Sequence, residues 1–342
     1  MGDYTKQKKL GAGGFGEVWL ALHIGLNVTH AVKFVDGASI RNPTEFYREP
    51  RLLKELAHDN IVQVFDAGRA GNDLYVAMEV LTGSIADIVQ KDPLKLRRVK
   101  SLFCEALKGL QYIHDRGYLH RDLKPANILV DDKQRGKIAD FGLAIPTKEV
   151  STATPAGTLT YVAPEILVTG ETSIATDIYA MGVSLYEAVN GTDYLPAMPS
   201  PLLLQNAISK GDFPDRDYYR VYIPTALKKV INKAMNIDPI KRFGSADDLR
   251  FALEAIPIRC SWKESNKPGQ RSWIAEDKKK KVEVLLKAQG SWRVAVFQTN
   301  RESCKRWQIH RLSATFPKEK DALRRVGEIT KALVSDFDLN KI

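Results

Sequence analysis

His120-Arg121-Asp122-Leu123-Lys124-Pro125-Ala126-Asn127 is the stretch that decides the fold, together with Asp140-Phe141-Gly142 further along the chain. The first segment places an acid, a base and an amide within six positions. Asp122 can take or orient a hydroxyl proton, Lys124 can neutralise a phosphoryl group, and Asn127 offers an oxygen to a metal ion. In the second segment, the carboxylate of Asp140 suits Mg²⁺, and Gly142 permits a sharp backbone turn.

Three further signals accompany these two segments. Gly11-Ala12-Gly13-Gly14-Phe15-Gly16-Glu17-Val18 contains glycines that let the backbone approach phosphate oxygens. Alone, it also fits a plain glycine-rich hairpin or a dinucleotide-binding turn, but that turn opens a helix, whereas a β-type run over 18–22 follows here. Lys33, in Ala31-Val32-Lys33, needs a phosphate or carboxylate partner if its apolar strand is buried, and none if the strand lies at an edge. The last signal is Ala163-Pro164-Glu165.

In order and spacing, these five signals resemble the eukaryotic-type (Hanks-type) Ser/Thr protein kinase family. The resemblance covers about residues 4–256. It implies a bilobal kinase fold of the α+β class, with a β-rich N-lobe at about 1–80 and a helical C-lobe at about 84–256. We therefore expect a kinase domain over 1–256 and an accessory domain over 257–342.

The resemblance also implies an ATP site between the two lobes. The glycine-rich loop should cover the ATP phosphates, Met78 should guard the back of the pocket, and the hinge should follow at Glu79 to Leu81. Val18, Ala31 and Leu129 should enclose the adenine. The complete set of implied ATP-binding residues is Gly11, Ala12, Gly13, Gly14, Phe15, Gly16, Val18, Ala31, Lys33, Met78, Glu79, Leu81 and Leu129.

Catalytic roles follow from the same resemblance. Asp122 should be the catalytic base, and Lys33 should hold the α- and β-phosphates while pairing with Glu49. Thr158 should brace Asp122 and Lys124. The implied catalytic residues are Asp122, Lys124, Lys33, Glu49 and Thr158, and the implied ligands for Mg²⁺, or for Mn²⁺ in its place, are Asn127 and Asp140.

Pro50 departs from the expected pattern, because it directly follows Glu49 inside the expected helix over 44–56. Proline lacks an N–H and costs about 3 kcal/mol or more in a helix interior. We therefore expect either a kink at this point or a helix that starts late. Glu45 is the weaker alternative partner for Lys33.

An alternative to an active enzyme is a pseudokinase, a binding module that keeps the fold. Such proteins usually lack the metal aspartate, the catalytic aspartate or the lysine, whereas Asp140, Asp122 and Lys33 are all present. Lys124 lies in the segment 120–127, which we call the catalytic segment, and Thr158 lies in a later loop. Both residues match the Ser/Thr form of the family rather than the tyrosine form.

Regulation by phosphate is suggested by Arg121, which precedes the catalytic aspartate. In the family, such an arginine often receives a phosphate from the activation segment, which corresponds here to residues 141–165. Ser151, Thr152 and Thr154 lie in that segment and are the candidate autophosphorylation sites. A phosphate there could pair with Arg121 and order the loop. The alternative is a polar loop without a regulatory site.

The last quarter of the chain differs in composition. Residues 1–256 contain 31 Lys/Arg and 31 Asp/Glu, whereas residues 257–342 contain 20 Lys/Arg and 10 Asp/Glu. The net charge of +10 therefore lies in the last quarter of the chain. Four of the five tryptophans lie there as well. This break near Pro257, where the family resemblance stops, indicates a domain boundary.

Alternating apolar residues predict strands over 282–287 and 292–299, joined by a hairpin turn at 288–291. A third strand is expected over 307–313, and Pro317 is placed to open a helix. One face of that helix carries Ala322, Val326, Ile329 and Leu333. We expect a small, basic α+β domain, of no family that we recognise.

Tryptophans interleaved with basic residues leave three roles open for this domain: binding of nucleic acid or another polyanion, docking of a protein substrate, or simple stabilisation of the kinase. Protein substrates are the partners that the kinase resemblance implies. No segment approaches the ~20 apolar residues of a membrane span, and three widely spaced cysteines indicate the cytoplasm. The oligomeric state stays open.

Overall fold

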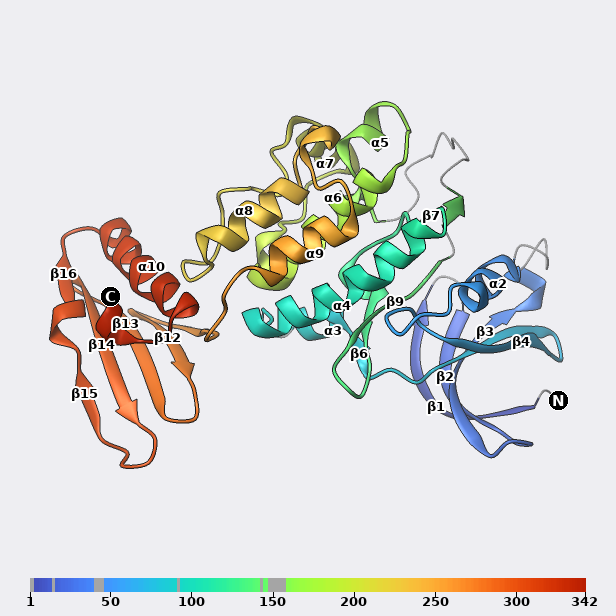
Figure 1. Ribbon diagram of the computed structural model, residues 1–342, viewed down its shortest axis with the longest axis horizontal. Helices are drawn as coiled ribbons and strands as arrows, with labels where there is room; N and C mark the ends of the chain where they lie inside the picture. Colours follow the sequence, from blue (N-terminus) through green and yellow to red (C-terminus); the bar gives the residue numbers. More distant parts are fainter. Residues whose placement is uncertain (1–2, 14–15, 40–45, 91–92, 142–143, 147–157) are drawn as a thin grey trace.

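The computed structural model describes residues 3–13, 16–39, 46–90, 93–141, 144–146 and 158–342. A β-rich lobe, a helical lobe and a second β-rich body follow one another along the long axis of the molecule (Figure 1). The predicted bilobal α+β fold with a C-terminal α+β region is confirmed.

The N-lobe is an antiparallel sheet in the order β1-β2-β3-β5-β4. One of its faces buries a small cluster that includes Val32 and Phe34, while the other face packs toward helix α2 and the C-lobe. Its elements are β1 (Tyr4–Gly13), β2 (Gly16–His23), β3 (Val28–Asp36), α2 (Arg48–Glu55), β4 (Val64–Ala70) and β5 (Asp73–Met78).

The described residues do not form one continuous helix up to Pro50, because Phe46 is helical, Tyr47 forms a turn and α2 begins at Arg48, while the expected start of the helix near residue 44 lies outside the described residues. The helix begins at Arg48, so Pro50 is its third residue, and the first helical hydrogen bond runs from the N–H of Arg51 to the carbonyl of Tyr47 at 3.1 Å. The N–H groups of a first turn have no partner inside the helix, so proline removes nothing there. Glu45 lies outside the described residues.

The C-lobe is built around α4, which buries an apolar stripe of residues at three- and four-residue spacing. Val99, Leu102 and Leu110, like the other members of that stripe, are at most 1% exposed. The helices of this lobe are α3 (Ile85–Val89), α4 (Leu96–Asp115), α5 (Pro164–Val168), α6 (Ile174–Asn190), α7 (Pro201–Lys210), α8 (Thr225–Ala234) and α9 (Ala246–Glu254). Its short strands are β6 (Gly83–Ser84), β7 (Tyr118–Leu119), β8 (Ile128–Val130), β9 (Gly136–Ile138) and β10 (Ile145–Pro146).

The C-terminal body is an antiparallel sheet in the order β11-β12-β13-β14-β15, with β16 also paired to β14. Helix α10 (Glu319–Ser335) follows the strands, and Ala322, Val326, Ile329 and Leu333 are fully buried on the predicted face. The strands are β11 (Lys263–Lys267), β12 (Gln270–Glu276), β13 (Lys280–Gln289), β14 (Ser291–Asn300), β15 (Arg306–Gln308) and β16 (Ala314–Phe316).

One sequence prediction for this body is wrong, and one of its hairpins was not predicted. The single strand expected over 307–313 is interrupted, because a 3₁₀ turn at His310–Leu312 separates β15 from β16. The hairpin of β11 and β12 was not predicted, because β11 is polar throughout and shows no alternation of apolar residues. The predicted hairpin between β13 and β14 is confirmed, and Gly290 lies in its turn with φ +70°.

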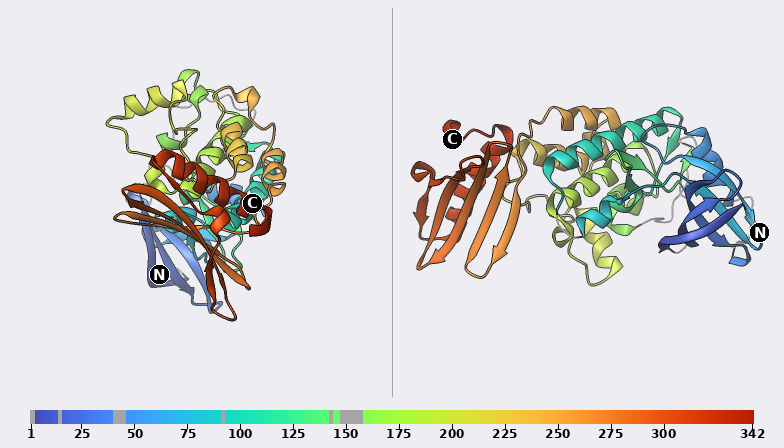
Figure 2. Two further views of the ribbon diagram at one scale, coloured as in Figure 1. Left: turned by 90° about the vertical axis from the view of Figure 1, so that its left-hand side faces the viewer. Right: turned by 90° about the horizontal axis from the view of Figure 1, so that it is seen from below.

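Backbone carbonyls and buried side chains fix the C-terminal body to the C-lobe. The guanidinium of Arg97 in α4 donates to the carbonyl of Ile258 at 3.1 Å, and the backbone N–H of Arg97 donates to the hydroxyl oxygen of Ser261 at 3.4 Å. Arg220 forms an ion pair with Glu264 of β11 at 2.8 Å. The body therefore lies at the end of the C-lobe that is remote from the N-lobe, as Figures 1 and 2 show.

Three of the four C-terminal tryptophans do not present free rings. Trp262 and Trp273 are 4% and 0% exposed, and Trp262 donates its ring N–H to the carbonyl of Thr330 at 3.1 Å. Trp292 is partly buried against the core, and Trp307 is 43% exposed. Most of the aromatic surface that suggested base stacking thus belongs to the core.

Within the described part of the chain, no helix combines the length and the apolar character that crossing a membrane requires. Cys104 and Cys260 are buried free thiols, and burial raises the pKa of Cys104 to about 11. Cys104 therefore acts as a packing residue on the α4 stripe, because a thiol is unreactive while it stays protonated.

Candidate active site

The N-lobe sheet presents most of the predicted nucleotide-binding residues on a single face. Val18 of β2 is paired with Lys33 of β3, and Ala31 of β3 is paired with Met78 of β5. Directly paired residues of antiparallel strands share a face, and so do residues two apart on one strand. Val18, Ala31, Lys33 and Met78 therefore line one side of the sheet, and Met78 packs on the core between the lobes.

The glycine-rich segment forms a hairpin between β1 and β2, with Gly13 paired to Gly16. Gly16 has φ +125°, and a Cβ there would lie 2.2 Å from the carbonyl oxygen of Phe34, so only glycine fits. A strand on each side distinguishes this loop from a dinucleotide-binding turn, which opens a helix. Gly14 and Phe15 lie outside the described residues.

Helix α2 brings Glu49 to the start of the activation segment. A carboxylate oxygen of Glu49 accepts a hydrogen bond from the N–H of Phe141 at 3.1 Å. Burial raises the pKa of Glu49, and the positive charge of Lys33 opposes that shift. The predicted partners Lys33 and Glu49 therefore lie close enough for their charges to interact.

The catalytic segment holds the Asp122 carboxylate from two sides. The ammonium group of Lys124 donates to Oδ2 of Asp122 at 2.7 Å, and Nδ2 of Asn127 donates to the same oxygen at 3.0 Å. Nδ2 of Asn127 also donates to the carbonyl of Asp122 at 2.7 Å. The three polar residues of the motif thus form one cluster around a single carboxylate.

Buried Asp177 of α6 holds the backbone of this segment in place. Its carboxylate accepts hydrogen bonds at 2.9 Å from the N–H groups of His120 and Arg121 and from Nε2 of His114. Burial alone would raise the pKa of Asp177, but the hydrogen bonds and His114 outweigh it, so the pKa is lowered. This support stabilises the left-handed backbone at Arg121, where φ is +69°.

His120 is a packing residue rather than a proton carrier. It is 0% exposed, it lies edge-to-face on Phe141 with ring centroids 4.9 Å apart, and its Nε2 lies 3.1 Å from the carbonyl of Ala139. Burial lowers the pKa of the imidazole, which therefore stays neutral.

Asn127 and Asp140 fit a magnesium site by their chemistry. Because Nδ2 of Asn127 is engaged by Asp122, the side-chain oxygen of Asn127 is its remaining polar atom, and Mg²⁺ prefers oxygen ligands. The N–H of Ala139 donates to the carbonyl of Asn127 at 2.9 Å, which places Asp140 next to Asn127 along the backbone. Across the described residues, no cluster of three or more His, Cys, Asp or Glu side chains offers another metal site.

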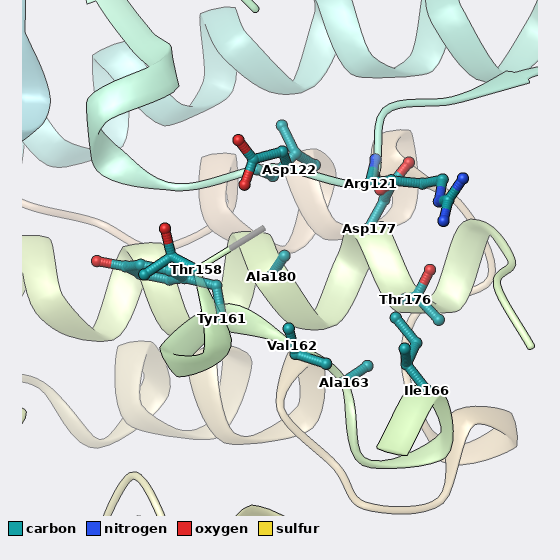
Figure 3. Close-up of a pocket in the computed structure, with 11 residues that line it drawn as sticks. Arg121, Asp122, Thr158, Tyr161, Val162, Ala163, Ile166, Thr176, Asp177 and Ala180 are labelled. Atoms are coloured by element: carbon teal, nitrogen blue, oxygen red, sulfur yellow. Dashed lines mark hydrogen bonds between the residues drawn. The ribbon is translucent and has the colours of Figure 1, made fainter. Parts of the chain in front are cut away.

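A pocket lies between the catalytic segment and the loop that ends at α5. Asp122 and Thr158 line facing sides of it, with Val162 and Ala163 along its floor (Figure 3). The hydroxyl of Tyr161 donates to Glu187 of α6 at 2.6 Å, which fixes one wall. The Asp122 carboxylate, Arg121 and the loop from Thr158 to Ala163 thus surround a small space beside the catalytic segment.

Three polar contacts escaped the sequence analysis because each joins residues far apart in the chain. Arg48 donates to the carbonyl of Ala144 at 3.2 Å. Lys137 of β9 forms a 2.7 Å ion pair with Glu79 of the predicted hinge, and the Tyr161–Glu187 bond is the third. The one sequence signal that pointed to Arg48 was its position directly before Glu49, the expected partner of Lys33. The candidate phosphosites Ser151, Thr152 and Thr154 lie outside the described residues.

A family model described as "Protein kinase domain" matches residues 4–251 of the chain. The match contains the glycine-rich hairpin, the catalytic segment and the polar network of the C-lobe. It ends before the C-terminal sheet, whose first strand begins at Lys263.

Curated relatives align over the same region. CBL-interacting protein kinase 17 of Oryza sativa subsp. japonica is 32% identical over 272 residues, which is 75% of this chain and 59% of that protein. Serine/threonine-protein kinase PknH of Mycobacterium bovis is 31% identical over 260 residues, 74% of this chain and 44% of that protein. CBL-interacting serine/threonine-protein kinase 12 of Arabidopsis thaliana is 31% identical over 253 residues, 71% of this chain and 50% of that protein.

The chain therefore spans about half the length of the curated relatives it matches. The family model nevertheless covers the greater part of the chain, from the first strand of the N-lobe to α9 of the C-lobe. The chain belongs to the protein kinase family, and its relatives are serine/threonine kinases.

Proposed function

We propose that this protein is an active Ser/Thr kinase that transfers the γ-phosphate of ATP to hydroxyl groups of proteins. The observation that carries the proposal is the Asp122 carboxylate, which lines a small pocket and which Lys124 and Asn127 hold at 2.7 and 3.0 Å. A pseudokinase would have no need to keep this carboxylate oriented.

In the proposed reaction, Asp122 accepts the proton of the incoming serine or threonine hydroxyl, and Lys124 offsets negative charge on the phosphoryl group as it moves. Lys33 holds the α- and β-phosphates, with Glu49 orienting it, and Thr158 positions the loop beside Asp122. Bound Mg²⁺, held by Asn127 and Asp140, would neutralise charge on the phosphate oxygens. Val18, Ala31 and Leu129 enclose the adenine, and the hinge beside Glu79 supplies backbone hydrogen bonds.

The direct test is incubation of the purified chain with γ-labelled ATP, Mg²⁺ and a mixture of denatured proteins, followed by phosphoamino acid analysis. We expect label on serine and threonine, because Lys124 and Thr158 match that form of the site. Label confined to tyrosine would contradict the proposed specificity, and no label under conditions where ATP binds would favour the pseudokinase.

We further propose that phosphate on Ser151, Thr152 or Thr154 is bound by two guanidinium groups. Burial lowers the pKa of Arg121, and the negative charge of Asp177 partly offsets that shift. The positive charge of Arg48 lowers the pKa of Arg121 further, so the two guanidinium groups lie close enough to repel each other. Two like charges placed together form a binding site for an anion that offsets their repulsion. Arg48 also contacts Ala144 near the start of the activation segment, so such a phosphate would tie that segment to α2.

Arg48→Ala is expected to lower the kcat of the autophosphorylated enzyme roughly tenfold, which corresponds to the loss of one charge-assisted hydrogen bond. Enzyme treated with phosphatase should not respond to the same substitution. Arg51→Ala is the matched control, because Arg51 is an exposed arginine on the same helix. An equal loss of activity in both phosphorylation states would refute the phosphate-binding role.

The basic C-terminal body is proposed as a protein-binding module rather than a nucleic-acid module, since two of its four tryptophans are buried. A cytoplasmic location is proposed on the strength of the free thiols Cys104 and Cys260.

A further inference from the structure

The C-terminal sheet has two unlike faces. On one face Trp273, Val284 and Val296 form a paired row that is completely buried, and α10 packs on that side. The opposite face carries Ile274, Leu285 and Phe297, which are partly exposed and lie outside the hydrophobic core. Figures 1 and 2 show α10 along one side of the sheet.

Strand register places these apolar residues in the middle of the open face. Ile274 pairs with Glu283, which pairs with Phe297, and in the neighbouring row Leu285 pairs with Ala295. Basic residues surround this centre on β11, β13, β14 and β15. The cations that register assigns to the open face are Lys263, Lys267, Lys281, Lys287, Arg293 and Arg306, and the acids are Glu276 and Glu283.

This composition fits a ligand that is both acidic and apolar. The two acids already have partners, because Glu283 forms an ion pair with Arg306 at 2.8 Å and Glu276 lies 3.7 Å from Arg301. Lys287 and Arg293 are paired opposite each other, with no acid beside them in that row. Like charges at directly opposed positions are destabilising, so an anion bound over them would relieve the repulsion.

A protein segment fits this face better than a nucleic acid does. The aromatic ring on the face, Phe297, is covered by the guanidinium of Arg306 at 3.8 Å, so it is not free to stack on a base. Aliphatic side chains such as Ile274 and Leu285 gain nothing from phosphates, but they can bury apolar side chains of a peptide.

We infer that the open face of the C-terminal sheet, defined by Ile274, Leu285, Phe297 and the six cations around them, docks an acidic amphipathic segment of a protein substrate. The inference rests on the proposed kinase function. Because the sheet is fixed to the C-lobe, a docked segment keeps its parent protein near the active site and raises the local concentration of the hydroxyl. Charge complementarity selects the segment, and the apolar centre stabilises the complex.

The test uses the full chain and a fluorescein-labelled peptide of alternating glutamate and leucine, with binding followed by anisotropy at low salt and without ATP. Lys287→Glu combined with Arg293→Glu is expected to weaken binding by roughly tenfold or more. Lys320→Glu combined with Arg324→Glu changes the net charge equally on exposed positions of α10, and is expected to change binding by less than about threefold.

Three results would overturn the inference: no binding of the peptide to the wild-type chain, an equal loss in both double variants, or tighter binding of oligothymidylate than of the peptide. Polyglutamate, which lacks the leucines, should bind more weakly than the peptide, and equal binding would contradict the role of the apolar centre.

A kinetic arm separates this inference from the proposed activity. A short serine peptide without the acidic segment should be phosphorylated equally by the wild type and by the Lys287→Glu/Arg293→Glu variant. Linking the acidic segment to that serine peptide should lower KM for the wild type alone and leave kcat unchanged. If no enzyme phosphorylates either peptide while the anisotropy result holds, the proposed function fails and the docking site stands.

Discussion

Asp122→Asn is expected to lower the rate of phosphoryl transfer by roughly 10²–10⁴-fold, the range in which a positioned general base contributes. Asparagine keeps the size of the side chain, and its amide oxygen can accept the hydrogen bonds that Lys124 and Asn127 now donate to Oδ2. It cannot take the proton of an incoming hydroxyl. The substitution should therefore remove the chemistry while the local structure persists.

Measurement of kcat with a serine peptide, together with ATP affinity, tests this prediction. ATP affinity should stay close to that of the wild type, because Asp122 is not among the residues expected to bind the nucleotide. Asp132→Asn is the control, since Asp132 is an exposed acid shortly after the catalytic segment. Near-normal kcat in Asp122→Asn would show that the carboxylate is not the base.

Arg242→Met is expected to lower the free energy of unfolding by about 3–5 kcal/mol, the typical cost of removing one member of a buried ion pair. The Arg242 side chain is 0% exposed and binds both carboxylate oxygens of Glu165, at 2.6 and 2.7 Å. It also donates to the carbonyls of Ala175, Asn236 and Ile237. Methionine fills a similar volume but leaves these acceptors without a donor.

Chemical denaturation of the full chain measures this loss, and Lys241→Met is the matched control. Lys241 precedes Arg242, but its side chain is 69% exposed and its ion pair with Asp238 is 3.6 Å long. Exposed pairs of this kind contribute about 1 kcal/mol or less. Equal destabilisation in the two variants would show that the Arg242–Glu165 pair does not anchor the C-lobe.

The sequence was sufficient to predict the catalytic cluster because its members are close together in the chain. Asp122, Lys124 and Asn127 lie within six positions, so their contact is almost a local property. The contact of Glu79 with Lys137, by contrast, joins residues 58 positions apart. Such a pair depends on how β9 meets the hinge, and no local pattern records that.

The C-terminal body shows the same distinction for the fold. Strands β13 and β14 were predicted because their buried face alternates with an exposed one, as Val282 and Val284 do with Glu283. Strand β11 gives no such pattern, since its residues are polar and it lies at the edge of the sheet. Its place is set by pairing with β12 and by the ion pair of Glu264 with Arg220, which are tertiary contacts.

The effect of Pro50 on the helix that carries Glu49 was predictable only as two alternatives, a kink or a late start. Proline forbids a helix interior at position 50, but the sequence does not say whether the chain kinks or begins its helix there. The structure begins the helix at Arg48, and this start leaves Glu49 in the first turn with its carboxylate on the N–H of Phe141.

The most direct test of kinase activity is a phosphoproteome comparison of cells that briefly express either the wild type or Asp122→Asn at equal levels. The proposed mechanism predicts phosphoserine and phosphothreonine sites on cellular proteins, and on the activation segment of the protein itself, that appear with the wild type alone. Identical phosphoproteomes, with ATP binding intact in both purified proteins, would contradict the proposal that this member of the kinase family is an active enzyme.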